Sequence, residues 1–192
     1  MYDKVYVMID TLQLTRGLTL ACCLLFLIPA SAATGQDFKI EPGHRAGKIT
    51  LGITAEAVHQ ILGQPSATYR MQGKLTGDVW MANTGNDVRV VYRRGQVIQV
   101  KVTSASFKTP EGLNTESSLA EVQKHYRKLS KTRRFVHGSG GGLIDYYDDV
   151  ARGIAFEFTS VASETPDFKP YAIVVHSPRS RVIPENDEEL AQ

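Results

Sequence analysis

The stretch that decides the fold is GITAEAVHQILGQP, residues 52–65. Thr54 is a favourable N-cap, because its hydroxyl can accept a hydrogen bond from the first helical turn. The apolar residues that follow recur at the spacing of one helix face, at Val58, Ile61 and Leu62. Gly63 and then Pro65 are typical of a helix end. The stretch therefore predicts a short helix over residues 54–62 with one buried face.

A second helix is predicted from residue 118 onwards. Residues 118–121 read Ser-Leu-Ala-Glu, which is the pattern of a capping box. In that motif the serine hydroxyl caps an amide of the first turn, and the glutamate accepts a hydrogen bond from the N-cap amide. The apolar stripe of this helix consists of Leu119, Val122, Tyr126 and Leu129.

Alternating apolar and polar residues predict a set of strands after each helix. The strands are expected at residues 79–81, 87–93, 96–102, 143–147, 153–158 and 171–175. Arg94 and Gly95 separate two of these runs, which predicts a β-hairpin.

The two halves of the chain align with each other. Thr54 and Val58 of the first helix lie over Ser118 and Val122 of the second at a constant offset of 64 residues, and strands follow each helix. Such internal similarity predicts a duplicated unit. The predicted fold class is therefore α+β, with tandem duplicated helix-plus-antiparallel-meander units and the helices packed on one face of the sheet. Neither unit can bury its apolar face alone, so we expect one shared core.

The composition indicates one globular domain. The chain has 192 residues, of which 42% are hydrophobic and 22% charged, and this length suits a single core. A formal net charge of +2 does not favour a nucleic-acid partner. We predict a signal peptide at residues 1–32, a flexible lead-in at 33–47, a single two-repeat domain at 48–177 and a disordered acidic tail at 178–192. Within the domain, repeat one spans 48–103 and repeat two spans 107–177.

Residues 16–33 have the organisation of a secretory signal peptide. Arg16 precedes an apolar run over residues 18–28, and the small residues Ala30 and Ala32 follow. This pattern predicts cleavage near Ala32. It also predicts a periplasmic or secreted location in a bacterium.

Two questions stay open at the N-terminus. An uncleaved membrane anchor is an alternative to cleavage, and either Met1 or Met8 can be the start. Cys22 and Cys23 both lie within the apolar run. Cleavage would therefore leave no cysteine for a disulfide, for thiol catalysis or for a thiolate metal site.

The first unit carries a resemblance to a known family. It reads Gly47-x-Ile-x-Leu-Gly52-Ile-Thr-x-x-x-Val58-x-x-x-Leu62-Gly63-x-Pro65, followed by the predicted meander. It resembles the repeat shared by the SmpA/OmlA family of outer-membrane assembly proteins and the β-lactamase-inhibitor-protein fold. It is also similar to a group of uncharacterised exported bacterial proteins with two such repeats. The resemblance spans residues 47–176 and implies helices on one side of an antiparallel sheet, with an open sheet face that makes protein contacts.

Two departures from that family stand in the sequence. The second unit has Glu116 where the family usually has the glycine that opens the helix turn. The assembly lipoproteins also carry an acylated cysteine, which the predicted mature chain lacks. The resemblance therefore bears on the fold more than on a role in outer-membrane assembly.

The candidate binding residues form one basic segment, residues 124–134. Six cations occur there without an acidic residue between them, and they are Lys124, Arg127, Lys128, Lys131, Arg133 and Arg134. If the second helix runs that far, the first four cations line one of its faces. The segment is then a candidate anion-binding site for anionic lipid, cell-wall polymer or an acidic protein patch. The alternative is an ordinary solvated helix face.

We expect no catalytic, cofactor or metal site. The glycines of residues 138–142 are followed by Leu143 rather than by a Lys-Ser/Thr pair, so a flexible linker explains them better than a phosphate loop. Asp145, Asp148 and Asp149 lack the spacing of an EF-hand calcium loop. Polar strand and turn positions account for them. The five histidines show no His-x-x-x-His spacing.

The leading hypothesis is a non-enzymatic exported envelope protein that acts as a protein–protein interaction module. Its expected partner is another envelope protein, of unknown identity. The alternative is a binder of anionic lipid or cell-wall polymer through the basic segment at 124–134. An unrecognised hydrolase is a remote third possibility, because a Ser-His-Asp site is recognised by geometry rather than by sequence position. The oligomeric state stays open.

Overall fold

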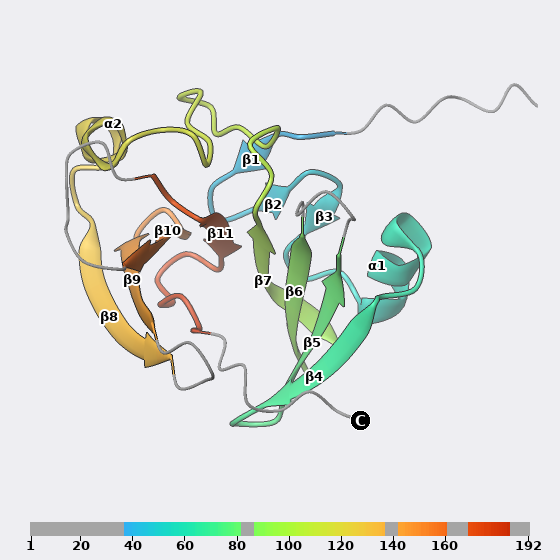
Figure 1. The fold of residues 1–192 in the computed structure, drawn as a ribbon. Helices are drawn as coiled ribbons and strands as arrows, with labels where there is room; N and C mark the ends of the chain where they lie inside the picture. The colour runs from blue at the N-terminus through green and yellow to red at the C-terminus, as the bar shows by residue number, and fades with distance from the viewer. Residues whose placement is uncertain (1–36, 82–86, 137–141, 161–168, 185–192) are drawn as a thin grey trace, which may run out of the picture. The chain divides into compact units, whose positions relative to one another are not determined.

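The computed structural model describes residues 37–81, 87–136, 142–160 and 169–184. The predicted signal peptide lies outside these residues. The described elements form a three-stranded sheet, an eight-stranded sheet and two helices (Figure 1). The small sheet consists of β1 (Ile40–Glu41), β2 (Arg45–Ala46) and β3 (Ile49–Thr50). The helices are α1 (Ala55–Leu62) and α2 (Leu119–His125).

The large sheet is antiparallel and has the strand order β4-β5-β6-β7-β11-β10-β9-β8. Its first four strands are β4 (Ala67–Met71), β5 (Leu75–Trp80), β6 (Val88–Arg93) and β7 (Gln96–Val102). Its other four are β8 (Ser130–Val136), β9 (Gly142–Asp149), β10 (Ile154–Ser160) and β11 (Ala172–His176). Strands β7 and β11 join the two sets, with Val100 opposite Val175.

The predicted fold class, α+β with tandem helix-plus-meander units, is wrong. The described residues are mainly strand, and their two helices are only 8 and 7 residues long. Pairing of β7 with β11 makes one continuous antiparallel sheet of eight strands. The chain is therefore mostly β. Residues 130–136, for which no strand is predicted above, form β8.

Both helix starts agree with the sequence prediction. Thr54 is the N-cap of α1 and accepts a hydrogen bond from the Ala57 N–H at 3.3 Å. Ser118 and Glu121 form the predicted capping box at the start of α2. Helix α2 nevertheless ends at His125, with Tyr126 as its C-cap. The predicted stripe therefore continues only as far as the cap.

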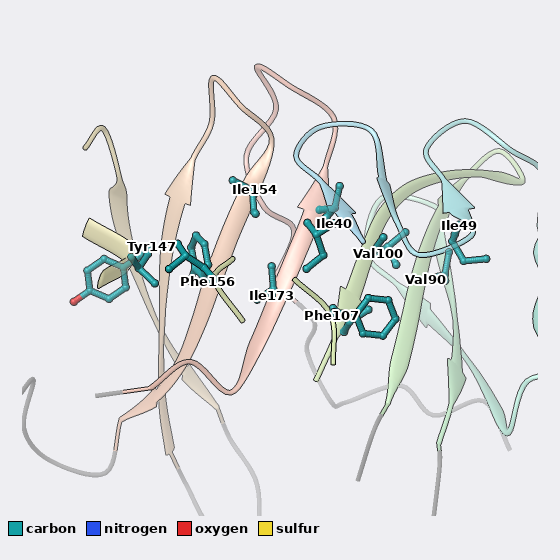
Figure 2. Packing of buried hydrophobic residues seen from close by; sticks show 14 of the residues in the cluster. Ile40, Ile49, Val90, Val100, Phe107, Tyr147, Ile154, Phe156 and Ile173 are labelled. Atoms are coloured by element: carbon teal, nitrogen blue, oxygen red, sulfur yellow. The ribbon is translucent and has the colours of Figure 1, made fainter. Parts of the chain in front are cut away.

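The helices and the small sheet share one apolar core with the large sheet. Val58 of α1 and Val122 of α2 are both 0% exposed and belong to the same buried cluster. Figure 2 shows labelled members of this cluster from several elements, among them Ile40, Ile49, Val90, Val100, Phe107, Tyr147, Ile154, Phe156 and Ile173. The two helices therefore cover the same face of the sheet.

The predicted flexible lead-in at 33–47 is wrong for its described part. Ile40 of β1 is 1% exposed and Ala46 of β2 is 3% exposed. The Ile40 N–H donates to the Lys108 carbonyl at 2.7 Å. These residues fold because their apolar side chains enter the shared core, although the surrounding sequence is polar.

The predicted disordered tail at 178–192 is wrong for residues 178–184. Val182 is 7% exposed, and its N–H donates to Asp148 Oδ2 at 3.0 Å. Ile183 forms two hydrogen bonds with the Gln99 side chain, of 2.8 and 2.9 Å. Their partners lie on β9 and β7, far away in the sequence, and local composition does not reveal them. Residues 185–192 lie outside the described residues.

Candidate functional site

The structure divides the predicted basic segment between three elements. Lys124 lies on α2, Arg127 and Lys128 follow the helix, and Lys131, Arg133 and Arg134 lie on β8. The helix ends at His125, so the condition for a single basic helix face, a helix that continues through residue 131, is not met. The last three cations lie on a strand instead, where successive side chains point to opposite faces of the sheet.

Two of the six cations form ion pairs with Asp145 of β9. Arg133 donates to both of its carboxylate oxygens, at 2.7 and 2.8 Å, and Lys131 Nζ lies 3.2 Å from Oδ2. The Asp145 side chain is only 1% exposed. Hydrogen bonds from Arg133, opposed by burial and supported by Lys131, hold the pKa of the Asp145 carboxyl below its usual value. Lys131 and Arg133 thus have a structural role in joining β8 to β9.

The remaining basic residues do not form a built site. Lys124, Arg127 and Lys128 are exposed, and no ion pair connects them to another described residue. The side chain of Arg134 lies outside the described residues.

The three aspartates considered as calcium ligands are also kept apart. Asp145 lies opposite Phe158, and Asp149 lies opposite Ile154, both on the helix-covered side of the sheet. Asp148 lies between them in the strand register and faces the other side, where Oδ1 is 2.9 Å from His176 Nε2. Among the described residues, no cluster of His, Cys, Asp and Glu side chains has the arrangement of a metal site. The glycines at 138–141 lie outside the described residues.

His59 of α1 and Asp78 of β5 form the polar pair that most resembles catalytic machinery. His59 Nε2 lies 2.7 Å from Asp78 Oδ2, and their side chains are 30% and 9% exposed. Burial, followed by the nearby Asp78 carboxylate, raises the pKa of Tyr92 above its ordinary value. The Trp80 ring packs edge-on against His59, with 5.9 Å between ring centroids. Such a pair can orient an imidazole, but no described serine or threonine hydroxyl hydrogen-bonds to it.

A buried polar layer occupies the sheet face opposite the helices. Lys101 of β7 and Glu157 of β10 form an ion pair of 3.1 Å, with side chains 7% and 2% exposed. Gln99, Asp148 and His176 lie in the same layer and bond to the chain at 177–183. These bonds fasten the segment after β11 across the sheet. We assign the layer a structural role, because its groups bond to one another and to the backbone.

The two end strands of the large sheet differ in charge. Strand β8 forms one edge and reads SKTRRFV, with three cations in seven residues. Strand β4 forms the other edge and reads ATYRM, with one cation in five. Edge strands present backbone groups to further strands, and charged side chains oppose such pairing. Strand β4 is therefore the edge better suited to pair with another chain.

Two exposed apolar side chains lie in the segments just before β4 and just after β5. Ile61 at the end of α1 is 40% exposed, and Met81 after β5 is 58% exposed. Trp80 is half-buried, and its Nε1 donates to the Gly63 carbonyl at 3.1 Å. The Met81 N–H donates to Ser66 Oγ, immediately before β4, at 3.2 Å. We call Ile61, Trp80 and Met81 the apolar group of β4.

Sequence reasoning missed this edge. Its signal is present, because Tyr69 and Met71 alternate with the exposed Thr68 and Arg70, but five residues are too few to stand out. The exposure of Ile61 was also unpredicted. Its place in the apolar stripe of the helix suggested burial, whereas only Val58 of α1 is fully buried.

Comparisons with known proteins add little. No protein-family model matches the sequence, and no curated protein is significantly similar. Several solved structures are similar, and the three described next each have a TM-score below 0.5.

The first is an extracellular protein containing a SCP domain from Bacillus anthracis, at 12% identity and a TM-score of 0.44, covering 67% of this chain and 44% of that chain. The second is a cysteine-rich secretory protein from Staphylococcus aureus, at 13% identity and a TM-score of 0.46. The match covers 73% of this chain and 50% of that chain. The third is the uncharacterized protein YfeY from Escherichia coli, at 15% identity and a TM-score of 0.39. The match covers 73% of this chain and 99% of that chain.

The chain thus spans half or less of the length of the first two structures. At these TM-scores the similarities carry no argument about function. The resemblance to the SmpA/OmlA family stays a prediction. In the described residues, no helix is long and apolar enough to cross a membrane.

Proposed function

We propose that the chain is a non-enzymatic exported protein that binds another envelope protein by strand addition at β4. In this mode, an extended segment of the partner pairs with an edge strand through main-chain hydrogen bonds. The observation that carries the proposal is the position of β4 at the end of the sheet order, with the exposed Thr68 and Arg70 on it.

The apolar group of β4 supplies the second part of the contact. Ile61 and Met81 expose 40% and 58% of their surfaces, and hydrogen bonds from Trp80 to Gly63 and from Met81 to Ser66 join the segments that carry them next to the start of β4. An apolar side chain on the added segment would cover them, which removes apolar surface from water. At the other end of β4, Arg70 and Lys74 are exposed. The fitting partner is therefore an extended segment with an apolar residue at one end and an acidic residue at the other.

The other edge does not compete for the same partner. Lys131 and Arg133 of β8 are engaged with Asp145, and pairing at β8 would bring an added strand against several positive charges. The alternative function through the basic segment at 124–134 has less support, because its cations lie on α2, on the residues after it and on β8 rather than on one helix face.

The export part of the proposal rests on the sequence. Arg16, the apolar run over 18–28 and the small residues up to Ala32 are the features of a signal peptide. Intact-mass measurement of protein from an exporting cell tests this part. A mature N-terminus within a few residues of Ala33 supports it, and a full-length mass contradicts it.

The binding part is tested with two charge-introducing variants. Met81→Asp should abolish the complex that the exported protein forms in detergent-solubilised envelope, measured as a shift in size on native gels. Tyr171→Asp is the matched control, because Tyr171 is also a large exposed apolar residue, at 46%, but lies beside β11. The control should keep the complex. Equal loss in both variants, or a complex unaffected by Met81→Asp, would contradict strand addition at β4.

A further inference from the structure

Two hairpin turns lie side by side at one end of the β4–β7 half of the sheet. Four residues are successive cross-strand partners there. Met71 of β4 lies opposite Leu75 of β5, Leu75 lies opposite Arg93 of β6, and Arg93 lies opposite Gln96 of β7. Neighbouring strands are about 4.8 Å apart. The turn at residues 72–74 and the turn at residues 94–95 are therefore adjacent.

These turns concentrate positive charge. Four cations lie in or next to them, namely Arg70, Lys74, Arg93 and Arg94, and all four are exposed. Residues 70–76 and 92–97 contain no aspartate or glutamate. In the part of the chain that the structure describes, none of the four forms an ion pair, unlike Lys131 and Arg133 with Asp145. We call these four residues the basic tips.

The backbone at the basic tips gives a second, independent observation. Lys74 has φ 61° and Arg94 has φ 55°, both in the left-handed region. That region favours glycine or asparagine, and other residues adopt it at a conformational cost. Non-glycine residues there are worth examining for a function that the side chain serves. Each turn thus holds a cation at a position where glycine or asparagine would fit the backbone better.

The placement of Arg70 and Arg93 excludes a small enclosed anion site. Arg70 lies in register with Thr76 and Tyr92, on the core side of the sheet, whereas Arg93 lies in register with Leu75, on the opposite side. The two faces therefore do not converge on one point. A flat anionic surface laid across the ends of the hairpins can contact all four cations together.

We propose that the basic tips dock the exported protein onto an anionic phospholipid surface. Each basic residue near such a surface contributes about fivefold to the partition coefficient, so four contribute several hundredfold together. The contact uses the ends of the strands, so the main-chain groups along β4 stay accessible, but Arg70 and Lys74 then face the lipid and not an acidic residue of the protein partner. It does not depend on strand addition at β4.

The test is co-sedimentation of protein purified from an exporting host with vesicles of about 30% phosphatidylglycerol in phosphatidylcholine. Pure phosphatidylcholine vesicles give the baseline for apolar insertion. The ratio of the two partition coefficients should be high at low salt. It should approach one near 0.5 M salt, where the Debye length falls to about 4 Å.

The double variant Lys74→Asn/Arg94→Asn removes two cations and relieves the left-handed strain, so it should melt at or above the wild-type temperature. Its partition ratio should fall about 25-fold. Lys124→Gln/Lys128→Gln is the control, with the same change of net charge on exposed residues elsewhere, and its ratio should stay within about twofold of wild type.

Equal losses in both double variants would show a net-charge effect and overturn the proposal. An unchanged ratio in Lys74→Asn/Arg94→Asn would also overturn it. So would a wild-type ratio near one, including the case in which the protein binds a soluble acidic protein instead. Since this assay contains no protein partner, its result is separate from that of the Met81→Asp experiment.

Discussion

Tyr69 of β4 lies over Gly77 of β5, its cross-strand partner, so closely that a Cβ atom at position 77 would be 2.6 Å from Tyr69 Cε1. The Tyr69 ring is 8% exposed. An aromatic ring that covers a cross-strand glycine fixes strand register. This contact therefore helps to hold β4 at the end of the sheet, where the proposed partner binds.

Gly77→Ala should lower the free energy of unfolding by about 1–3 kcal/mol, because the new methyl group would overlap the Tyr69 ring. Urea denaturation measures the loss. The double variant Tyr69→Leu/Gly77→Ala should lose less than the sum of the two single variants. Wild-type stability in Gly77→Ala would show that the ring does not hold the strand.

Lys101→Met should lower the free energy of unfolding by about 3–5 kcal/mol, because it leaves Glu157 charged and buried at 2% exposure. Replacing both partners, as Lys101→Met/Glu157→Leu, should lose less than the single variant. The comparison is made by chemical denaturation at neutral pH. A double variant with fully additive losses would contradict the coupling of the pair.

Asp145 should contribute to the pH dependence of stability. Its pKa is lower in the folded protein than in the unfolded chain. Its stabilisation is therefore present above the unfolded pKa, near 4, and is lost as the pH falls through the folded pKa. Asp145→Asn should lower the free energy of unfolding by about 1–2 kcal/mol at pH 7. The loss is kept this small because Lys131 and Arg133 are partly exposed, and solvent screens their attraction to the carboxylate.

Thermal melts from pH 7 down to pH 3 check this prediction. The difference in stability between the wild type and Asp145→Asn should narrow with acidification. A constant difference across that range would mean that the carboxylate charge does not matter.

Val58→Ala and Val122→Ala should each lower the free energy of unfolding by about 1–3 kcal/mol, since both side chains are 0% exposed in the shared core. Thermal or urea denaturation measures the loss. Gln60→Ala, at an exposed position of α1, is the control and should change stability by less than about 0.5 kcal/mol. A negligible loss in either valine variant would contradict a core shared by both helices.

Local patterns in the sequence were sufficient for the helix starts and the central hairpin. Thr54 and Ser118 cap their helices through groups only three residues away, so the signal lies within one turn. Alternation likewise predicted β7 at residues 96–102 with the observed bounds. Such features depend on neighbours in the sequence, and a single chain is enough to recognise them.

The elements that were mispredicted depend on distant partners. Lys131 reads as part of a helix face until it and Arg133 are seen to pair with Asp145 on the next strand. Ile183 reads as part of a polar tail, although the Gln99 side chain binds its backbone. The apolar group of β4 was missed for the opposite reason. Ile61 has helical spacing with Val58, but it is 40% exposed, whereas Val58 is buried.

Site-specific photo-crosslinking tests the central claim, strand addition at β4, most directly. A benzophenone amino acid is placed at Thr68 on β4 or at Thr132 on β8, the opposite edge, and the exported protein is irradiated in intact cells. Position 68 should give one crosslinked product with a different protein, absent when Met81→Asp is added, and position 132 should give none. Equal products from both edges, no product from position 68, or a product that contains only two copies of this chain would contradict the claim.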